Sequence, residues 1–235
     1  MISNDSDRAV GTVLVTGGAS GLGAATVDAI RAAGGSPLVL DIARPAADVP
    51  FIAVDLADSA AAEAAVEQIV ADNGGQLDGV VTAAGIDSCG PLGAVATKDW
   101  ERVVFVNLLG TVAVVRAALP YLEQSHGRVV TVSSTLGIKA VGDATAYCAS
   151  KFGVVGFTRA LAAETAGTVG VTLLVPGGMH TAFFDDRTEQ YKPPVDATLN
   201  RPQDVAQSIV FALGQPAGCE LRELVVAHST ESSWP

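Results

Sequence analysis

The chain has 235 residues, of which 49% are hydrophobic, and its formal net charge is −11. This composition provides the apolar material for a large buried core. The acidic balance and the lack of any cluster of lysine and arginine residues exclude a nucleic-acid-binding protein.

The first ten residues, MISNDSDRAV, lack the basic and apolar regions of a secretory signal, and we find no run that approaches the roughly 18 apolar residues of a membrane span. The three cysteines, Cys89, Cys148 and Cys219, lie far apart and have no histidine at a metal-ligand spacing. We therefore expect a soluble protein of a reducing, cytoplasmic compartment, with no metal and no membrane partner.

Short apolar runs rich in β-forming residues alternate with alanine-rich helical segments along the chain. The expected strands are 12–17, 37–41, 51–55, 79–85, 127–134, 171–177 and 223–226. The expected helices are 21–33, 60–75, 98–123, 144–165 and a last one over 201–213. Because the strands are continuously apolar, they predict a parallel sheet covered on both faces. We expect one α/β domain over residues 1–235, a doubly wound, Rossmann-like sheet of about seven strands.

Two connections depart from this regular alternation. Only thirteen residues separate Asp41 from Asp55, and two prolines interrupt them, so we expect a loop there in place of a crossover helix. The segment 177–200 is long for an ordered connection. Long loops inside compact domains are usually lids or binding loops, so this segment is predicted to be a substrate lid.

The first expected strand runs into a glycine-rich turn, TGGASGLG, over residues 16–23. Its glycines, Gly17, Gly21 and Gly23, are spaced G-x-x-x-G-x-G. A dinucleotide pyrophosphate requires such a tight turn, a close approach of the backbone, and amides at a helix N-terminus. The pattern indicates a dinucleotide site, although glycine-rich turns after strands are common.

The residue that ends the second strand, Asp41, lies eighteen residues beyond Gly23, where an acid accepts hydrogen bonds from an adenosine ribose. A carboxylate there repels a 2′-phosphate, and the glycine loop has Ser20 and no basic residue. NAD is therefore favoured over NADP. Arg44, three positions past Asp41, supports the alternative of NADP.

The helical segment TAYCASKFG, residues 145–153, has Tyr147 and Lys151 four positions apart, so that both project from one face. The small residues between them allow a large group to approach the helix closely. Taken alone, this pair is most simply a surface pair.

In combination, these features resemble the short-chain dehydrogenase/reductase family over roughly residues 10–228. TGGASGLG matches the family's TGxxxGxG, and YCASK matches its Tyr-x-x-x-Lys. VDLAD places Asp55 and Leu56 at the family's adenine pocket, and VNLLG supplies a helix asparagine, Asn107. VSS places Ser134 thirteen residues before Tyr147, and PGGMHT resembles PGxxxT.

The resemblance implies an oxidoreductase that moves a hydride between a nicotinamide and a secondary alcohol or ketone. The catalytic residues that it implies are Asn107, Ser134, Tyr147 and Lys151. The cofactor-binding residues that it implies are Gly17, Ser20, Gly21, Leu22, Gly23, Asp41, Asp55, Leu56, Ala83, Ala84, Gly85, Tyr147, Lys151, Pro176, Gly177, Met179 and Thr181.

In this interpretation Tyr147 is the general acid/base. An ammonium about 5 Å away would favour its phenolate by roughly 3 kcal/mol, or about two pKa units, so Lys151 is expected to lower the pKa of Tyr147. Ser134 would hold the substrate oxygen, and Asn107 would hold a water that links Lys151 to solvent. Ser133 is expected to be structural.

The expected substrate is a neutral, mainly apolar alcohol or ketone, because the candidate pocket walls at 86–92, 136–141 and 179–191 are mostly apolar. His180 lies at the expected pocket edge. One alternative is an NADPH-dependent carbonyl or ketoacyl reductase. Another, of a different class, is a non-catalytic dinucleotide-binding scaffold, against which the complete catalytic set argues.

Two departures from the family pattern stand out. The segment TAAG, residues 82–85, replaces the common NNAG and lacks an amide that braces the sheet. The C-terminal residues 220–235 lack the VTG…DGG ending of many tetrameric members. By family analogy we expect a homodimer or homotetramer, with the helices at 98–123 and 144–165 forming the dimer contact.

Overall fold

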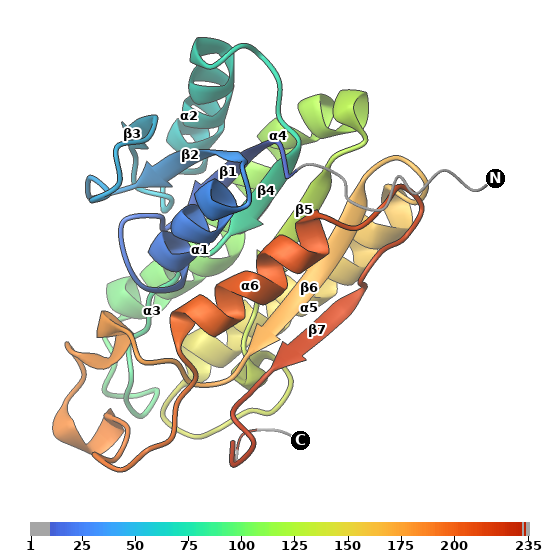
Figure 1. Cartoon of the computed structure of the whole chain (residues 1–235). Helices are drawn as coiled ribbons and strands as arrows, with labels where there is room; N and C mark the ends of the chain where they lie inside the picture. The colour runs from blue at the N-terminus through green and yellow to red at the C-terminus, as the bar shows by residue number, and fades with distance from the viewer. Residues whose placement is uncertain (1–9, 232, 234–235) are drawn as a thin grey trace.

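The structure, a computed structural model, describes residues 10–231 and 233. Its centre is a sheet of seven strands in the order β3-β2-β1-β4-β5-β6-β7, in which every neighbouring pair is parallel (Figure 1). The strands are β1 (Thr12–Thr16), β2 (Ser36–Asp41), β3 (Phe51–Ala53), β4 (Gly79–Thr82), β5 (Arg128–Val132), β6 (Gly170–Pro176) and β7 (Glu223–Val226). The predicted doubly wound α/β architecture is confirmed.

Helices cover both faces of this sheet, and each face has its own hydrophobic core. The helices are α1 (Gly21–Ala32), α2 (Ser59–Asp72), α3 (Thr97–Val104), α4 (Thr111–Ser125), α5 (Thr145–Glu164) and α6 (Pro202–Leu213). α1 and α6 pack together on one face, where Ile30 and Ile209 are fully buried. α2, α4 and α5 supply the other core, which contains Val66 and Leu122. Burial on both sides explains why the strands are continuously apolar.

Several strands are shorter than the sequence indicates, β5 among them with only Arg128–Val132 of the predicted 127–134. β3 has three residues, Phe51–Ala53, and β4 ends at Thr82, so the apolar run 83–85 lies outside the sheet. The connection from Asp41 to Asp55 contains no helix, as predicted, because residues 42–50 form bends and irregular backbone.

The segment predicted as one helix over 98–123 is continuous but not uniform. α3 passes into a π-helical stretch, Phe105–Gly110, which passes into α4. By length and composition Thr97–Ser125 is apolar enough to cross a membrane, so the expectation that no run approaches the apolar content of a membrane span is wrong. Half of its most apolar window is buried inside the fold, and it packs against α2 and α5, as the core helix of a globular fold does.

All seven strands end at the same edge of the sheet, and the functional loops gather there. β1 and β4 are neighbours although they are not consecutive, so the chain winds in opposite directions on either side of this pair. Ligands bind at such a switch point in open α/β sheets. The segment 177–200 and the residues that follow β7 lie at the same edge (Figure 1).

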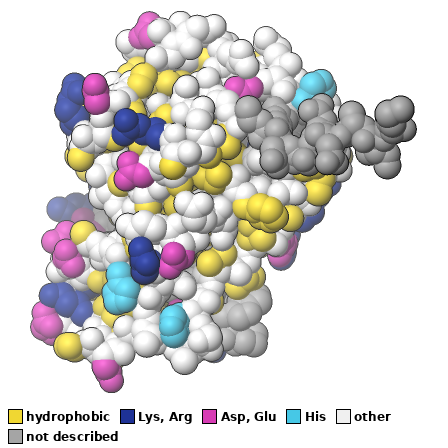
Figure 2. All heavy atoms as spheres, in the orientation of Figure 1, with side chains coloured by type: hydrophobic (Ala, Val, Ile, Leu, Met, Phe, Trp, Pro, Cys, Tyr) yellow, Lys and Arg dark blue, Asp and Glu magenta, His cyan; other side chains and the backbone are white. Residues whose placement is uncertain are grey.

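Charged side chains of both signs are mixed on the face of the molecule in Figure 2. Lys and Arg side chains are scattered among Asp and Glu side chains there. Apolar side chains also appear singly or in small groups on this face, which is normal for a folded domain.

Candidate active site

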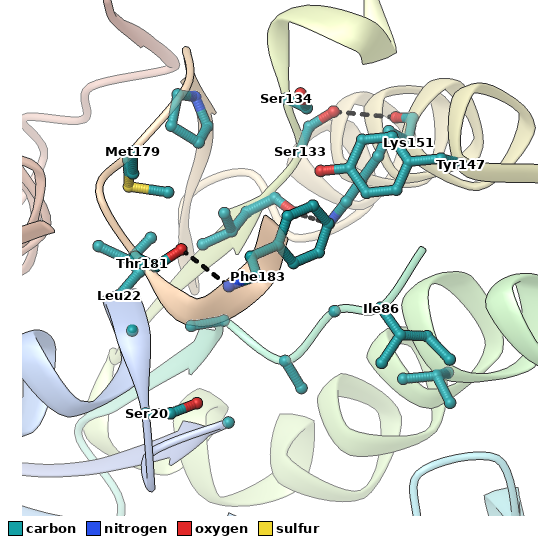
Figure 3. A pocket seen from close by; sticks show the side chains of 18 of the residues that line it. Ser20, Leu22, Ile86, Ser133, Ser134, Tyr147, Lys151, Met179, Thr181 and Phe183 are labelled. Atoms are coloured by element: carbon teal, nitrogen blue, oxygen red, sulfur yellow. Dashed lines mark hydrogen bonds between the residues drawn. The ribbon is translucent and has the colours of Figure 1, made fainter. Parts of the chain in front are cut away.

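A cavity of about 500 Å³ lies at the carboxyl edge of the sheet and extends from the end of β2 to the N-terminal part of α5. In Figure 3, Ser20 and Leu22 of the glycine loop lie on one side of it, and Ser134, Tyr147 and Lys151 lie on the other. Met179, Thr181 and Phe183 come from the segment after β6. The volume falls within the range of ordinary small-molecule sites, which is about 300–1,000 Å³.

The glycine loop is built by backbone contacts that exclude side chains. Gly17 has φ +71°, and a Cβ there would lie 2.7 Å from Ala84 Cα. A Cβ at Gly23 would lie 2.0 Å from the carbonyl oxygen of Gly17. Ser20 is the N-cap residue of α1 and makes no capping hydrogen bond with its side chain, so the first-turn amides remain available for an anion. The loop therefore fits a pyrophosphate.

Asp41 ends β2 at the cavity wall, and two backbone amides fix its carboxylate. Ala19 N donates to Oδ2 at 2.9 Å, and Ala43 N donates to Oδ1 at 3.0 Å. Arg44 is exposed and does not line the cavity, because its guanidinium stacks on the Phe51 ring at 5.4 Å. The charge at this corner is therefore that of the carboxylate.

The far corner beside Asp41 is apolar on one side and charged on the other. Ile42 and Leu56 both line the cavity there, and Ile42 is 71% exposed. Asp55 accepts a hydrogen bond from Ala57 N and pairs with Arg102 at 2.9 Å, which together hold the pKa of Asp55 below its usual value. Sequence reasoning missed Arg102, because it lies on α3 and no local motif marks it.

Ser134, Tyr147 and Lys151 converge on the other end of the cavity. Burial raises the pKa of Tyr147 to about 12, although a hydrogen bond with the Ser134 side chain opposes this. Lys151 Nζ donates to Val132 O at 2.9 Å and lies 5.7 Å from the Tyr147 ring centroid. Burial lowers the pKa of Lys151 to about 8. The expected lowering of the Tyr147 pKa by Lys151 does not appear in the protein alone, because desolvation of the phenolate is the largest effect on this pKa.

Asn107 is fully buried in the π-helical stretch and does not line the cavity. Its Oδ1 accepts from Ile86 N at 2.8 Å, and its Nδ2 donates to Ile86 O at 2.9 Å and to Ser150 Oγ at 3.1 Å. A Cβ on Gly85 would lie 3.6 Å from both Asn107 Oδ1 and Lys151 Nζ, so these two groups approach the same point. The side chain braces the chain after β4 against α5.

The predicted cofactor-binding residues lie almost entirely along the cavity. All the proposed cofactor-binding residues line the cavity except Gly23, which lies behind the loop that it allows to close. Ser133 donates to Lys151 O at 2.9 Å and also lines the cavity, so its purely structural role stays a prediction. Where TAAG replaces the family's first asparagine, the buried Thr82 hydroxyl has no hydrogen-bond partner among the described residues.

Only some residues of the predicted walls line the substrate end of the cavity. The apolar side chains that line it are Ile86, Leu136, Met179, Phe183 and Phe184. The predicted wall residues Leu92, Ile138 and Val141 do not line it and are 39% to 64% exposed. His180 lines a separate depression on the segment after β6, away from the main cavity.

The 177–200 segment is anchored to the loop after β4 by a buried ion pair. Arg187 Nη2 lies 2.6 Å from Asp87 Oδ2, with side-chain exposures of 18% and 5%. The Arg187 guanidinium also stacks on Phe183 and Phe184, and Phe183 contacts the Tyr147 ring at 5.7 Å between centroids. This pairing joins residues a hundred positions apart, so nothing local in the sequence predicts it.

The chain is similar to known enzymes along most of its length. A family model described as short chain dehydrogenase matches residues 11–192. The chain is 32% identical over 225 residues to a (2S)-[(R)-hydroxy(phenyl)methyl]succinyl-CoA dehydrogenase subunit from Thauera aromatica, covering 87% of this chain and 90% of the relative. It is 30% identical over 224 residues to D-threitol dehydrogenase from Mycolicibacterium smegmatis, covering 87% and 86%. A ligand-free aldohexose dehydrogenase of Thermoplasma acidophilum has the same fold, with a TM-score of 0.82, 24% identity and coverage of 92% and 91%.

The buried ammonium of Lys151 predicts a pH-dependent penalty on folding. Its pKa is about 8 in the fold and 10.5 as the unperturbed value, so between these values the unfolded chain binds a proton that the folded chain has lost. Stability therefore rises with pH through this window. Relative to Lys151→Met, the wild-type free energy of unfolding should increase by about 2 kcal/mol between about pH 7.5 and about pH 9.5, measured by urea unfolding.

Lys98→Met, which removes an exposed ammonium from α3, is the matched control and should show no comparable change. A wild-type protein that gains no stability over Lys151→Met in this window would contradict the burial of a charged lysine.

Proposed function

The chain belongs to the short-chain dehydrogenase family and is an NAD(P)-dependent oxidoreductase of alcohol or carbonyl groups. On that premise, we propose that it transfers hydride between NAD and a neutral, mainly apolar secondary alcohol or ketone. One observation carries the proposal, namely that a single cavity joins the Asp41 corner and the glycine loop to Ser134, Tyr147 and Lys151.

Each catalytic side chain has a distinct task in this proposal. A bound nicotinamide ring supplies or accepts the hydride. Tyr147 moves a proton to or from the substrate oxygen, a role worth about 10²–10⁴ in rate. Ser134, which hydrogen-bonds Tyr147, holds the same oxygen in register. Lys151 supplies positive charge behind Tyr147, and Asn107 fixes the backbone over which Lys151 lies.

The pKa of Tyr147 decides how the site responds to pH. A hydroxyl with a pKa of about 12 is protonated at neutral pH, so it is ready to donate a proton to a carbonyl oxygen. Alcohol oxidation needs the deprotonated form, whose population grows with pH. Oxidation should therefore accelerate as pH rises, while reduction slows.

Support for NAD comes from the corner around Asp41. Its carboxylate is fixed at the cavity wall, whereas Arg44 is held against Phe51 outside the cavity. A ribose 2′-hydroxyl can donate to the carboxylate, and a 2′-phosphate would be repelled by it. An NADPH-dependent carbonyl or ketoacyl reductase, which would use Arg44, is therefore the less favoured alternative.

The substrate proposal rests on the lining at the catalytic end. Its side chains are mostly apolar, and Arg187 is already neutralised by Asp87. We propose that the 177–200 segment acts as a lid, supported by the contact of Phe183 with Tyr147. A non-catalytic scaffold is disfavoured, because it would not need a serine, tyrosine and lysine gathered at one end of the cavity.

Oligomeric state and location are further proposals. Apolar side chains remain exposed on the π-helical stretch between α3 and α4 and on α5. Phe105, Leu109 and Phe152 are between 39% and 43% exposed. These elements pack together, so the exposed side chains favour a dimer through this face. The three cysteines are unpaired, which supports a reducing, cytoplasmic compartment.

Tyr147→Phe tests the catalytic assignment. It should lower kcat by at least about 100-fold while leaving NADH binding unchanged, because it removes the transferable proton and little else. Steady-state turnover and nicotinamide fluorescence give the two readouts. Tyr121→Phe, a tyrosine on α4 outside the cavity, is the control. If Tyr147→Phe kept wild-type turnover, Tyr147 would not be the acid/base.

Fluorescence titration with NADH and NADPH tests the cofactor proposal. The wild type should bind NADH more tightly, and Asp41→Ala should narrow the difference by about tenfold, because it removes the charge that repels the 2′-phosphate. Asp48→Ala, in the same exposed loop, should leave the ratio unchanged. Tighter binding of NADPH by the wild type would overturn the assignment.

Phe152→Glu tests the dimer. The wild type should have twice the mass of one chain or a multiple of that, and Phe152→Glu should shift the mass toward one chain, as measured by light scattering. Phe211→Glu on α6, which is 62% exposed, is the matched control. Dissociation by Phe211→Glu alone would assign the contact to the α6 face instead.

A further inference from the structure

The described part of the chain after β7 returns to the cavity, and no motif in the sequence predicts this. Glu231 and Ser233 both line the cavity. The hydroxyls of Ser233 and Thr135 are hydrogen-bonded at 2.6 Å, and Gly178 N donates to Glu231 Oε2 at 3.0 Å. Glu231 N donates to His228 O at 2.8 Å, which fixes the turn that brings the carboxylate back.

These contacts place Glu231 between two segments that carry site residues. Thr135 follows Ser134 directly, and Gly178 precedes Met179. A substrate whose oxygen is held by Ser134 and Tyr147 therefore shares its cavity with this carboxylate. A hydrogen bond between the hydroxyls of Thr198 and Thr230, at 2.6 Å, also ties this tail to the 177–200 segment.

Glu231 differs from the other charged groups at this end of the cavity. Arg187 is paired with Asp87, and the ammonium of Lys151 is hydrogen-bonded to Val132 O. Glu231 makes no ion pair among the described residues. Its partners are the uncharged donors Gly178 N, Ser233 N and Ser233 Oγ. Its negative charge is therefore solvated by dipoles and faces the cavity.

A carboxylate in this arrangement still has room for one more donor. An ionised carboxylate offers about four lone-pair sites, and three protein donors use three of them. The remaining site suits a neutral hydroxyl, and a second anion placed there would be repelled. A wall of methylene groups would neither accept a hydrogen bond from a hydroxyl nor repel an anion.

We infer that Glu231 is a specificity-determining residue, which accepts a hydrogen bond from a second hydroxyl of the substrate and rejects a carboxylate at that position. The favoured substrates are then neutral diols and hydroxyketones. This inference rests on the proposed oxidoreductase function, and it deepens it by naming the substrate class of the same cavity.

Glu231→Gln is the sharpest test, because glutamine keeps the shape and the acceptor oxygen while it removes the charge. With NADH as reductant, kcat/KM is measured for acetoin, which has a second hydroxyl, for butanone, which lacks it, and for acetoacetate, which has a carboxylate. The wild type should prefer acetoin over both. Glu231→Gln should improve the ratio of acetoacetate to acetoin by about tenfold or more.

Two controls separate the possible outcomes. Glu189→Gln removes a carboxylate that is 89% exposed on the 177–200 segment, and it should leave these ratios unchanged. NADH affinity, measured by fluorescence, should be the same in the wild type and in Glu231→Gln. Altered NADH affinity with unchanged ketone ratios would overturn the inference and assign Glu231 to the cofactor.

Failure of the proposed function would look different. In that case no ketone would oxidise NADH in the wild type, although NADH would still bind. Turnover of butanone and acetoin at equal kcat/KM, with no response to Glu231→Gln, would leave the oxidoreductase function intact and overturn only the role of Glu231.

Discussion

The contact between the Gly17 turn and Ala84 is the constraint on which the cofactor end of this protein depends. The turn follows β1 and Ala84 follows β4, so the contact closes the sheet edge where the winding direction reverses. A side chain on Gly17 would meet backbone rather than a movable group, so the two loops could not approach each other. The same turn holds the carboxylate of Asp41, which accepts a hydrogen bond from Ala19 N.

At the other end of the cavity, desolvation is the dominant physical effect. It acts in opposite directions on two groups, since it raises the pKa of Tyr147 and lowers that of Lys151, and in both cases the neutral form gains. A tyrosine and a lysine on the surface would keep their ordinary pKa values, because water would screen them from a bound ligand. The fold limits the access of solvent to this pair by burying Lys151 and by placing Phe183 against the Tyr147 ring.

The sequence was sufficient for the features that rest on local chemistry. Continuous apolar runs predicted the parallel sheet, and the glycine spacing with Asp41 predicted one end of the cavity. The resemblance to a known family supplied Ser134, Tyr147 and Lys151, which the structure brings together. It also supplied Asn107, but the structure assigns that side chain to the backbone of Ile86 rather than to the cavity.

What could not be predicted depends on contacts between distant parts of the chain. The Asp87–Arg187 pair spans a hundred positions, and the return of Glu231 depends on a turn that has no distinctive composition. The raised pKa of Tyr147 does not follow from the sequence, which shows a neighbouring charge but not the extent of burial. In each case the missing information is three-dimensional packing, which one-dimensional spacing does not contain.

The π-helical stretch at Phe105–Gly110 also limits how this chain can vary. Successive residues of an α-helix are rotated by about 100°, so removing one residue from this stretch would turn everything before it by that angle relative to α4. The Asn107 amide and the apolar stripe of α4 could then no longer both face their present partners. A change of length is tolerated in most surface loops, but here it would shift the frame of an entire helix.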